Sequence, residues 1–199
     1  LTCQIAFLGI VFSILIGIFC MAVKFYKLKF LSKLVDCYVE LSRNTPLLIQ
    51  LFFLYYGLPK LGVSMSGFTC AVVGLSFLGG SYMSESFRLG FEAVRKSQIE
   101  AGLSIALSKN QLLRYVILPQ AFSVALPSIS ANVIFLLKET SIVSIVALAD
   151  LVYVAKDLIG LYYKTDEALF MLVISYLIII LPVSLALSYV EKRVRNARS

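Results

Sequence analysis

The segment ALFMLVISYLIIILPVSLALSYV, residues 168–190, contains no charged side chain between Glu167 and Glu191. A helix needs about 20 consecutive apolar residues to span the hydrocarbon core of a bilayer. Three further uncharged runs have the required length, and they cover residues 1–23, 61–84 and 115–137. The sequence therefore predicts an all-α membrane protein with several spanning helices.

The composition supports this class. Hydrophobic residues make up 60 % of the 199 residues, charged residues make up 15 %, and the mean hydropathy is +0.92. Soluble domains carry about 25 % charged residues, and disordered chains have low hydrophobicity. The net charge of +7 is more typical of a topology signal than of a nucleic-acid partner. We expect a single transmembrane domain over residues 1–199.

Two shorter apolar stretches complete the predicted topology. Residues 44–59 form a short uncharged run that can extend back through the mixed stretch 31–41, which gives five predicted spans. Residues 140–149 have half the needed length, so we expect a re-entrant or protein-covered segment. Because the chain begins at Leu1 rather than Met, we expect a fragment or trimmed domain. We expect 1–23 to be a retained span, since a signal peptide has an apolar core of about 7–15 residues preceded by basic residues.

Lysine and arginine residues predict the orientation. With five spans, 14 of the 18 basic residues, Arg198 among them, fall in loops on one side. The other side holds Lys60, Lys138, Lys156 and Lys164. Cytoplasmic loops carry the excess of basic residues, so the sequence predicts an N-terminus outside and a C-terminus inside.

The cytoplasmic loop at about 88–118 has the pattern of two short helices. Ser97–Glu100 and Ser108–Gln111 both fit a capping box, in which a hydroxyl and an acidic or amide side chain satisfy free amides at a helix start. We expect a tight corner between the helices and a helix boundary at Pro119. The loop could be a solvated connector or a docking element for a cytoplasmic partner.

Polar groups at the ends of the spans are candidate functional residues, because charge in lipid is costly. Lys138, Glu139, Thr140 and Ser141 could line a translocation path, with Lys138 attracting a carboxylate, or could form only a local ion pair. Glu85 and Arg88 lie one helical turn apart and could form a structural ion pair or a gate.

Small and helix-breaking residues predict local geometry. Thr45 followed by Pro46, directly after Arg43, is typical of a helix start. Pro127 and Pro182 favour kinks within their spans. Gly79-Gly80 permits close helix contact, at a subunit interface for example.

The chain offers little for catalysis or metal binding. Histidine is absent, and the four cysteines, Cys3, Cys20, Cys37 and Cys70, show no metal-binding spacing. A Gly-x-x-x-x-Gly-Lys-Ser/Thr loop, the usual cradle for nucleotide phosphates, is also absent. We therefore expect neither an enzyme nor a bound cofactor, and any ATP would bind elsewhere.

The loop resembles the Glu-Ala-Ala loop of ABC importer permeases. Glu100-Ala101-Gly102 is followed by Ala106 and, after nine residues, by Val116-Ile-Leu118-Pro119. Gly102 replaces the second alanine of the family pattern and Ala106 replaces its glycine. If that glycine occupies a left-handed turn, alanine costs about 1 kcal/mol there. We therefore expect either that the helix continues through Ala106 or that the corner lies at 107–109.

Four other motifs are similar to the polar amino-acid uptake branch of that family. Arg43-Asn-Thr-Pro-Leu-Leu48 resembles Arg-Gly-Thr-Pro-Leu-Leu, and residues 51–59 match its continuation. The branch pattern Tyr-x-x-Glu-x-x-Arg is met by Tyr82, Glu85 and Arg88. The stretches 118–121 and 137–141 fit as well.

This resemblance implies a permease subunit with the type I importer fold in the inner membrane of a bacterial cell. It implies a second permease subunit (a copy or a paralogue), an ABC ATPase dimer that binds ATP and Mg, and an extracytoplasmic amino-acid-binding protein. Glu100 would contact the ATPase, or it could only cap its own helix. The alternative is an ion-coupled secondary transporter, which would use acids within its spans and often shows inverted repeats. The long runs predicted to span the membrane contain no aspartate or glutamate, which argues against this alternative.

Overall fold

Four long helices form the body of the computed structural model, which describes residues 1–196. They are α1 (Thr2–Phe25), α4 (Gly67–Glu92), α7 (Leu118–Glu139) and α9 (Thr165–Asn196). Each belongs to a helical stretch long and apolar enough to cross a bilayer. No strand occurs among the described residues, so the all-α prediction is confirmed. Arg198, which contributed to the predicted charge bias, lies outside this range.

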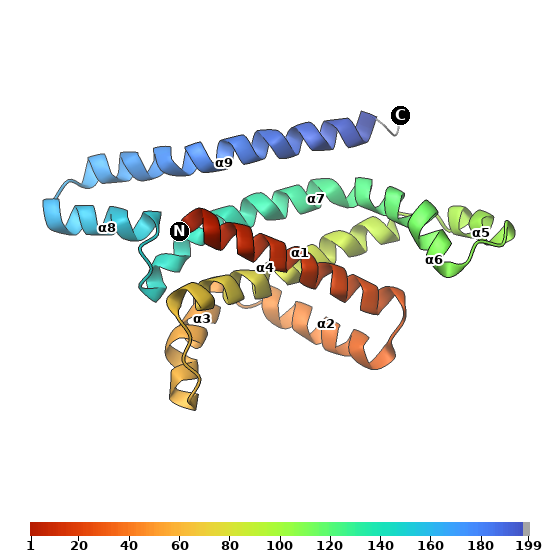
Figure 1. The fold of residues 1–199 in the computed structure, drawn as a ribbon, viewed down its shortest axis with the longest axis horizontal. Helices are drawn as coiled ribbons and strands as arrows, with labels where there is room; N and C mark the ends of the chain where they lie inside the picture. Colours follow the sequence, from red (N-terminus) through yellow and green to blue (C-terminus); the bar gives the residue numbers. More distant parts are fainter. Residues whose placement is uncertain (197–199) are drawn as a thin grey trace.

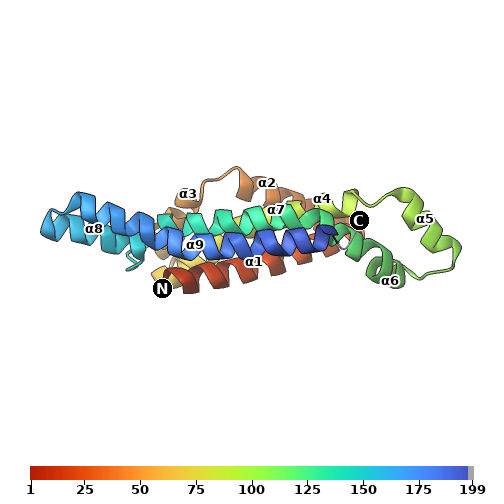
Figure 2. The ribbon, with the colours of Figure 1, turned by 90° about the horizontal axis from the view of Figure 1, so that it is seen from above.

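The long helices do not all run in the same direction. In Figure 1, α1, α4 and α9 run one way and α7 runs the other way. The N-terminus and the C-terminal end of α9 therefore lie at opposite ends of the bundle. Figure 2 shows α9 lying along α7, which it contacts, while α1 packs mainly on α4.

Small residues allow α4 to approach α1, α7 and the shorter α2 (Lys29–Arg43) closely. A Cβ added to Gly17 would lie 2.6 Å from the Met83 Cβ, and one added to Gly79 would lie 2.6 Å from the Leu136 Cδ1 on α7. One added to Gly80 would meet the Tyr38 hydroxyl at 2.6 Å. The close contact predicted at Gly79-Gly80 is confirmed, and these contacts join helices of the same chain.

The predicted fifth span consists of two helices. α2 (Lys29–Arg43) ends at the Asn44–Pro46 break, and α3 (Leu47–Phe52) follows it, continued by η1 (Phe53–Gly57) and η2 (Leu58–Leu61). Figure 1 shows α3 pointing away from the axis of the bundle. Pro46 caps α3 rather than occupying its first turn, so the predicted helix start is shifted by one residue.

The short apolar run after α7 is covered by protein. It forms the 3₁₀ helix η4 (Thr140–Val146), in which Thr140, Val143 and Val146 are at most 1 % exposed. The protein-covered alternative is thus confirmed. A 3₁₀ helix lying in protein satisfies the rule that irregular backbone avoids lipid.

Asp150 begins the next helix, α8 (Leu151–Tyr162), and sequence reasoning missed it. Its Oδ1 accepts a hydrogen bond of 2.9 Å from the Tyr153 amide as an N-cap. Its Oδ2 is buried without a partner among the described residues. Burial raises the pKa of the Asp150 carboxyl above the usual aspartate value. The protonated carboxyl therefore contributes to the stability of the folded state at low pH, and this contribution is lost as the pH rises through the raised pKa.

The loop between α4 and α7 contains the two predicted short helices. They are α5 (Lys96–Ser104) and α6 (Lys109–Leu112), and the π-helix η3 (Leu113–Ile117) leads into α7, which Pro119 opens. The capping box at Ser108 and Gln111 is confirmed. The one at Ser97 is wrong, because α5 begins at Lys96 and its N-cap, Arg95, makes no side-chain cap bond.

The corner between α5 and α6 lies at Ala106, which has a left-handed φ of 60°. Both alternatives predicted for this residue are therefore wrong. The Ala106 amide donates to the Leu103 carbonyl at 2.9 Å, and the Leu107 amide donates to the Gly102 carbonyl at 3.1 Å. This pair of bonds is the Schellman arrangement, which normally places glycine at the left-handed residue.

Ala106→Gly is expected to stabilise this corner by about 1 kcal/mol, because glycine adopts a left-handed φ without the Cβ clash. Hydrogen exchange followed by mass spectrometry should show about fivefold slower exchange of the amides at 106 and 107. Ala106→Val should speed the same amides, since a β-branched residue fits this conformation poorly. Faster exchange in the glycine variant would contradict this account of the corner.

Candidate functional site

The break between α2 and α3 is held by side chains that satisfy the last carbonyls of α2. Asn44 Nδ2 donates to the Glu40 carbonyl at 2.7 Å, and Thr45 Oγ1 donates to the Leu41 carbonyl at 2.8 Å. Gln50 Nε2 reaches back to the Ser42 and Thr45 carbonyls at 3.2 and 2.9 Å. Carbonyls at a helix C-terminus need such partners, so the break has a defined geometry.

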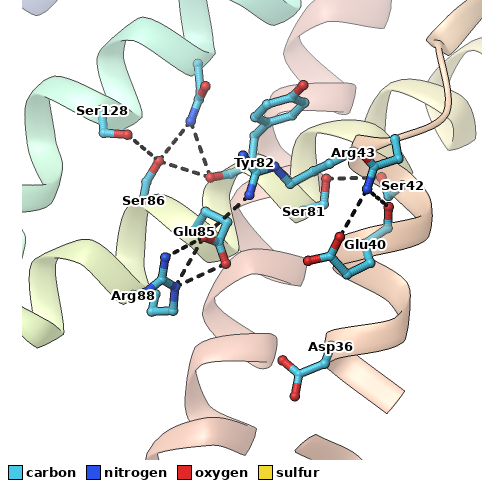
Figure 3. Close-up of polar contacts among 12 residues, drawn as sticks. Asp36, Glu40, Ser42, Arg43, Ser81, Tyr82, Glu85, Ser86, Arg88 and Ser128 are labelled. Carbon is cyan, nitrogen blue, oxygen red and sulfur yellow. Dashed lines mark hydrogen bonds and ion pairs between the residues drawn. The ribbon is translucent and has the colours of Figure 1, made fainter. Parts of the chain in front are cut away.

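Arg43, at the end of α2, contacts a charged row along α4 (Figure 3). Its Nη1 lies 3.5 Å from Glu85 Oε2, and its guanidinium lies 5.5 Å from the centre of the Tyr82 ring. Arg88 Nη2 lies 2.7 Å from the same Glu85 oxygen, and Arg88 Nη1 lies 2.8 Å from Glu92. The predicted Glu85–Arg88 ion pair is confirmed, and Arg43 ties it to a second helix.

This arrangement leaves the Arg43 charge available to a ligand. The Glu85 side chain is only 19 % exposed and its carboxylate is shared with Arg88, whereas the Arg43 side chain is 42 % exposed. A single ion pair of 3.5 Å at a partly exposed site neutralises a guanidinium weakly. Arg43 can therefore bind an anionic group while keeping its contacts to α4.

A cavity of about 290 Å³ lies beside Arg43 and joins the predicted segments at 43–46 and 138–141. Its wall includes Thr45 from the break, Tyr82 from α4 and Glu139 from the end of α7. Glu139 is half-buried and has no hydrogen-bond or ion-pair partner among residues 1–196. The cavity thus presents one cation and one unpaired carboxylate to a small ligand.

The other members of the 138–141 segment do not share this position. Lys138 is exposed and does not line the cavity. Thr140 is 1 % exposed, and its hydroxyl donates to the Leu137 carbonyl at 2.7 Å. Ser141 is half-buried and lies outside the lining. The structure thus favours Arg43 over Lys138 as the partner of a carboxylate, because Arg43 faces the same cavity as Glu139.

Polar side chains also bridge α4 and α7 next to the cavity, and sequence reasoning did not identify them. Asn132 Nδ2 donates to Ser86 Oγ at 2.8 Å and to the Tyr82 carbonyl at 3.3 Å. Ser128 Oγ lies 2.8 Å from Ser86 Oγ (Figure 3). The available signal was the presence of small polar residues in apolar spans, which commonly bond across helices.

The α5–α6 loop forms a second candidate site beyond the other end of α7 (Figures 1 and 2). Glu100 is exposed and lies in the middle of α5, so it does not cap its helix, and its carboxylate has no partner among residues 1–196. Ala101, Leu118 and Pro119 are exposed as well.

Gly102 forms the inner side of this loop. It is buried, and a Cβ added to it would lie 2.5 Å from Leu112 Cδ1. The loop therefore packs through Gly102 and presents Glu100 outward. The loop and the cavity lie at opposite ends of α7. Leu118 and Glu139, the first and last residues of this helix, are separated by about 30 Å at 1.5 Å per residue.

The chain is similar to known transport proteins over most of its length. The family described as "Binding-protein-dependent transport system inner membrane component" matches residues 9–196. The "Probable amino-acid ABC transporter permease protein PatM" of Vibrio harveyi is 36 % identical over 88 % of this chain and 80 % of its own length. The "Probable glutamine ABC transporter permease protein GlnM" of Bacillus subtilis is 31 % identical, over 93 % of this chain and 86 % of that protein.

A solved structure agrees with these sequence relatives. The crystal structure of an amino acid ABC transporter with histidines superposes with a TM-score of 0.89 at 33 % identity, covering 96 % of this chain and 90 % of that one. The family match covers both candidate sites, from the first turns of α1 to the end of α9. This chain belongs to the family of binding-protein-dependent transport system inner membrane components.

Proposed function

We propose that this chain is the permease subunit of an ATP-driven importer for polar amino acids in the inner membrane of a bacterial cell. The observation that supports an amino acid as the substrate is the cavity that holds Arg43 and the unpaired Glu139, while the resemblance of the motifs supports the polar class. An amino acid brings an α-carboxylate and an α-ammonium group, which complement these two charges. Charge-assisted hydrogen bonds of this kind are roughly twice as strong as hydrogen bonds between neutral groups.

The proposed topology places the α5–α6 loop in the cytoplasm, the N-terminus outside and the C-terminus inside. The excess of lysine and arginine in the loops at that end supports this orientation. The bundle geometry agrees with it, because the two ends of the described chain lie at opposite ends (Figure 1). In this arrangement α2 and α3 together form a fifth, broken crossing, with its break beside the cavity.

The energy for transport comes, in this proposal, from a separate ABC ATPase dimer that binds ATP and Mg. Glu100 supports such a partner, because an exposed carboxylate with no intrachain contact can form a charge-assisted bond with another subunit. Closure of the ATPase dimer would move the α5–α6 loop, and α7 would carry that motion to the cavity. The permease itself then needs no bound cofactor.

Two further partners complete the importer. A second permease, either a copy of this chain or a paralogue, would cover apolar surface such as α9, in which Ala168 is the buried residue. An extracytoplasmic amino-acid-binding protein would deliver substrate at the end of the bundle opposite the loop. The bilayer covers the remaining apolar faces.

Affinity purification of the full-length tagged protein from its native membrane, in mild detergent, tests these assignments. Identification of partners by mass should recover a soluble protein with a phosphate-binding loop in stoichiometric amount. It should also show whether the second permease is a paralogue. Recovery of no ATPase, even after chemical cross-linking, would contradict the proposal.

A further inference from the structure

Two adjoining hollows lie at the loop end of the bundle, and none of their lining residues lines the candidate amino-acid cavity. The larger has a volume of about 750 Å³, and its wall combines charged and aromatic residues. The smaller has a volume of about 220 Å³, and its wall is almost entirely apolar. They share Met21, Phe25, Tyr26 and Phe91 as walls, so the charged hollow lies directly beside the apolar one.

The larger hollow has an excess of positive charge. Lys24, Lys27, Arg88 and Lys109 line it, and Glu92 is the acid in its wall. Arg88 is neutralised by Glu85 and Glu92, and Lys24 lies 2.6 Å from Asp36. The ammonium groups of Lys27 and Lys109 are exposed and have no ion-pair partner among residues 1–196. This compartment is therefore complementary to an anion.

The smaller hollow lies on the side of the charged hollow that faces the membrane-spanning part of the bundle. Ala22 and Ile18 line it about one and two turns before the end of α1, and Phe87 lines it from α4. Both helices are candidate membrane spans, so these residues lie deeper along the span than Lys24 and Lys27. A ligand that fills both hollows has an anionic head and an apolar tail. A free phosphate would leave the apolar compartment empty.

We infer that the two hollows together bind one anionic phospholipid of the membrane. Lys27 and Lys109 meet its phosphate, and the apolar hollow takes the start of an acyl chain. Basic pockets between spanning helices on the cytoplasmic side are suited to such headgroups. The inference goes beyond the transport proposal and requires only that this end of the bundle lies at a membrane surface.

The position of the lipid links it to the α5–α6 loop. Tyr26, in the wall shared by both hollows, donates a hydrogen bond of 3.3 Å to Asn110 Oδ1 on α6. Leu103 and Leu112 of the loop line the charged hollow. The bound lipid therefore touches both α1 and the loop helices, and it braces the loop against the bundle.

Native mass spectrometry of the full-length protein, purified with its partners, tests the inference by titration with dioleoylphosphatidylglycerol. The double variant Lys27→Gln, Lys109→Gln should bind this lipid about 30-fold more weakly, which corresponds to about 1 kcal/mol for each lysine. The matched control is Lys29→Gln, Lys33→Gln, which removes the same charge from exposed α2 positions outside the hollows. The control should bind within twofold of the parent protein.

Three outcomes would overturn the inference. Equal losses in the two double variants would mean that only diffuse surface charge attracts the lipid. If glycerol phosphate displaced the bound lipid as effectively as added diacyl lipid does, the hollow would be assigned to a free phosphate. Undiminished binding in Ala22→Trp, which fills the apolar hollow and leaves the lysines intact, would exclude an acyl chain there. The readout is lipid retention, so none of these results depends on whether the transport proposal holds.

Discussion

Glu139→Gln should reduce amino-acid uptake about 30-fold at limiting substrate. The substitution keeps the shape of the side chain and removes the cavity charge that we propose to face the substrate ammonium group. A hydrogen bond to a charged group contributes about 2 kcal/mol, which equals that factor in affinity. Uptake of labelled amino acid by reconstituted complex, measured well below saturation, provides the test. Saturating substrate should restore much of the rate.

Lys138→Gln is the matched control, because Lys138 is adjacent in the sequence, exposed and outside the cavity. Its uptake should stay within twofold of the parent protein. Arg43→Gln should lose at least as much uptake as Glu139→Gln, since it removes the cation that we propose for the substrate carboxylate and one contact to Glu85. If Lys138→Gln and Glu139→Gln assembled normally and lost uptake equally, the assignment of this cavity as the amino-acid site would be contradicted.

Glu100→Lys should lower the amount of ATPase that copurifies with the permease by at least about tenfold. In the proposed interface, reversing this charge replaces an attraction with a repulsion, and truncating one member of such a pair already costs about 2 kcal/mol or more. The fold should tolerate the change, because Glu100 is exposed and lacks an intrachain partner. Insertion in the membrane and thermal unfolding in detergent should therefore match the parent protein.

Asp157→Lys provides the same change of charge at an exposed position on α8, beyond the opposite end of the bundle (Figure 1). It should leave ATPase recovery unchanged. Glu100→Gln should fall between the parent protein and the lysine variant. Full ATPase recovery and full uptake in Glu100→Lys would remove Glu100 from the coupling contact.

The long helices were predictable from sequence because their signal is averaged over some 20 residues. The uncharged runs 1–23 and 168–190, for example, correspond to α1 and α9. The fifth span was harder, because its run is interrupted by Thr45-Pro46, and a local break decides whether one helix or two form. The Glu85–Arg88 pair was predictable from its spacing on one helix.

The candidate site required the tertiary structure. Arg43 and Glu139 are 96 positions apart in the sequence, and no periodicity shows that they line one cavity. Thr140 looked as available as Glu139, yet it is buried in the turn into η4. Ala106 was misassigned for a different reason, since alanine is a strong helix former and gives no local sign of a left-handed turn.

The central claim is that a partner ATPase, rather than an ion gradient, drives amino-acid movement through this chain. Uptake by proteoliposomes that contain the purified complex and its binding protein tests this claim directly. With ATP and Mg on the side of the α5–α6 loop, labelled amino acid should accumulate, and a non-hydrolysable ATP analogue should abolish accumulation. Accumulation driven by a proton or sodium gradient without ATP would contradict the account and identify an ion-coupled secondary transporter.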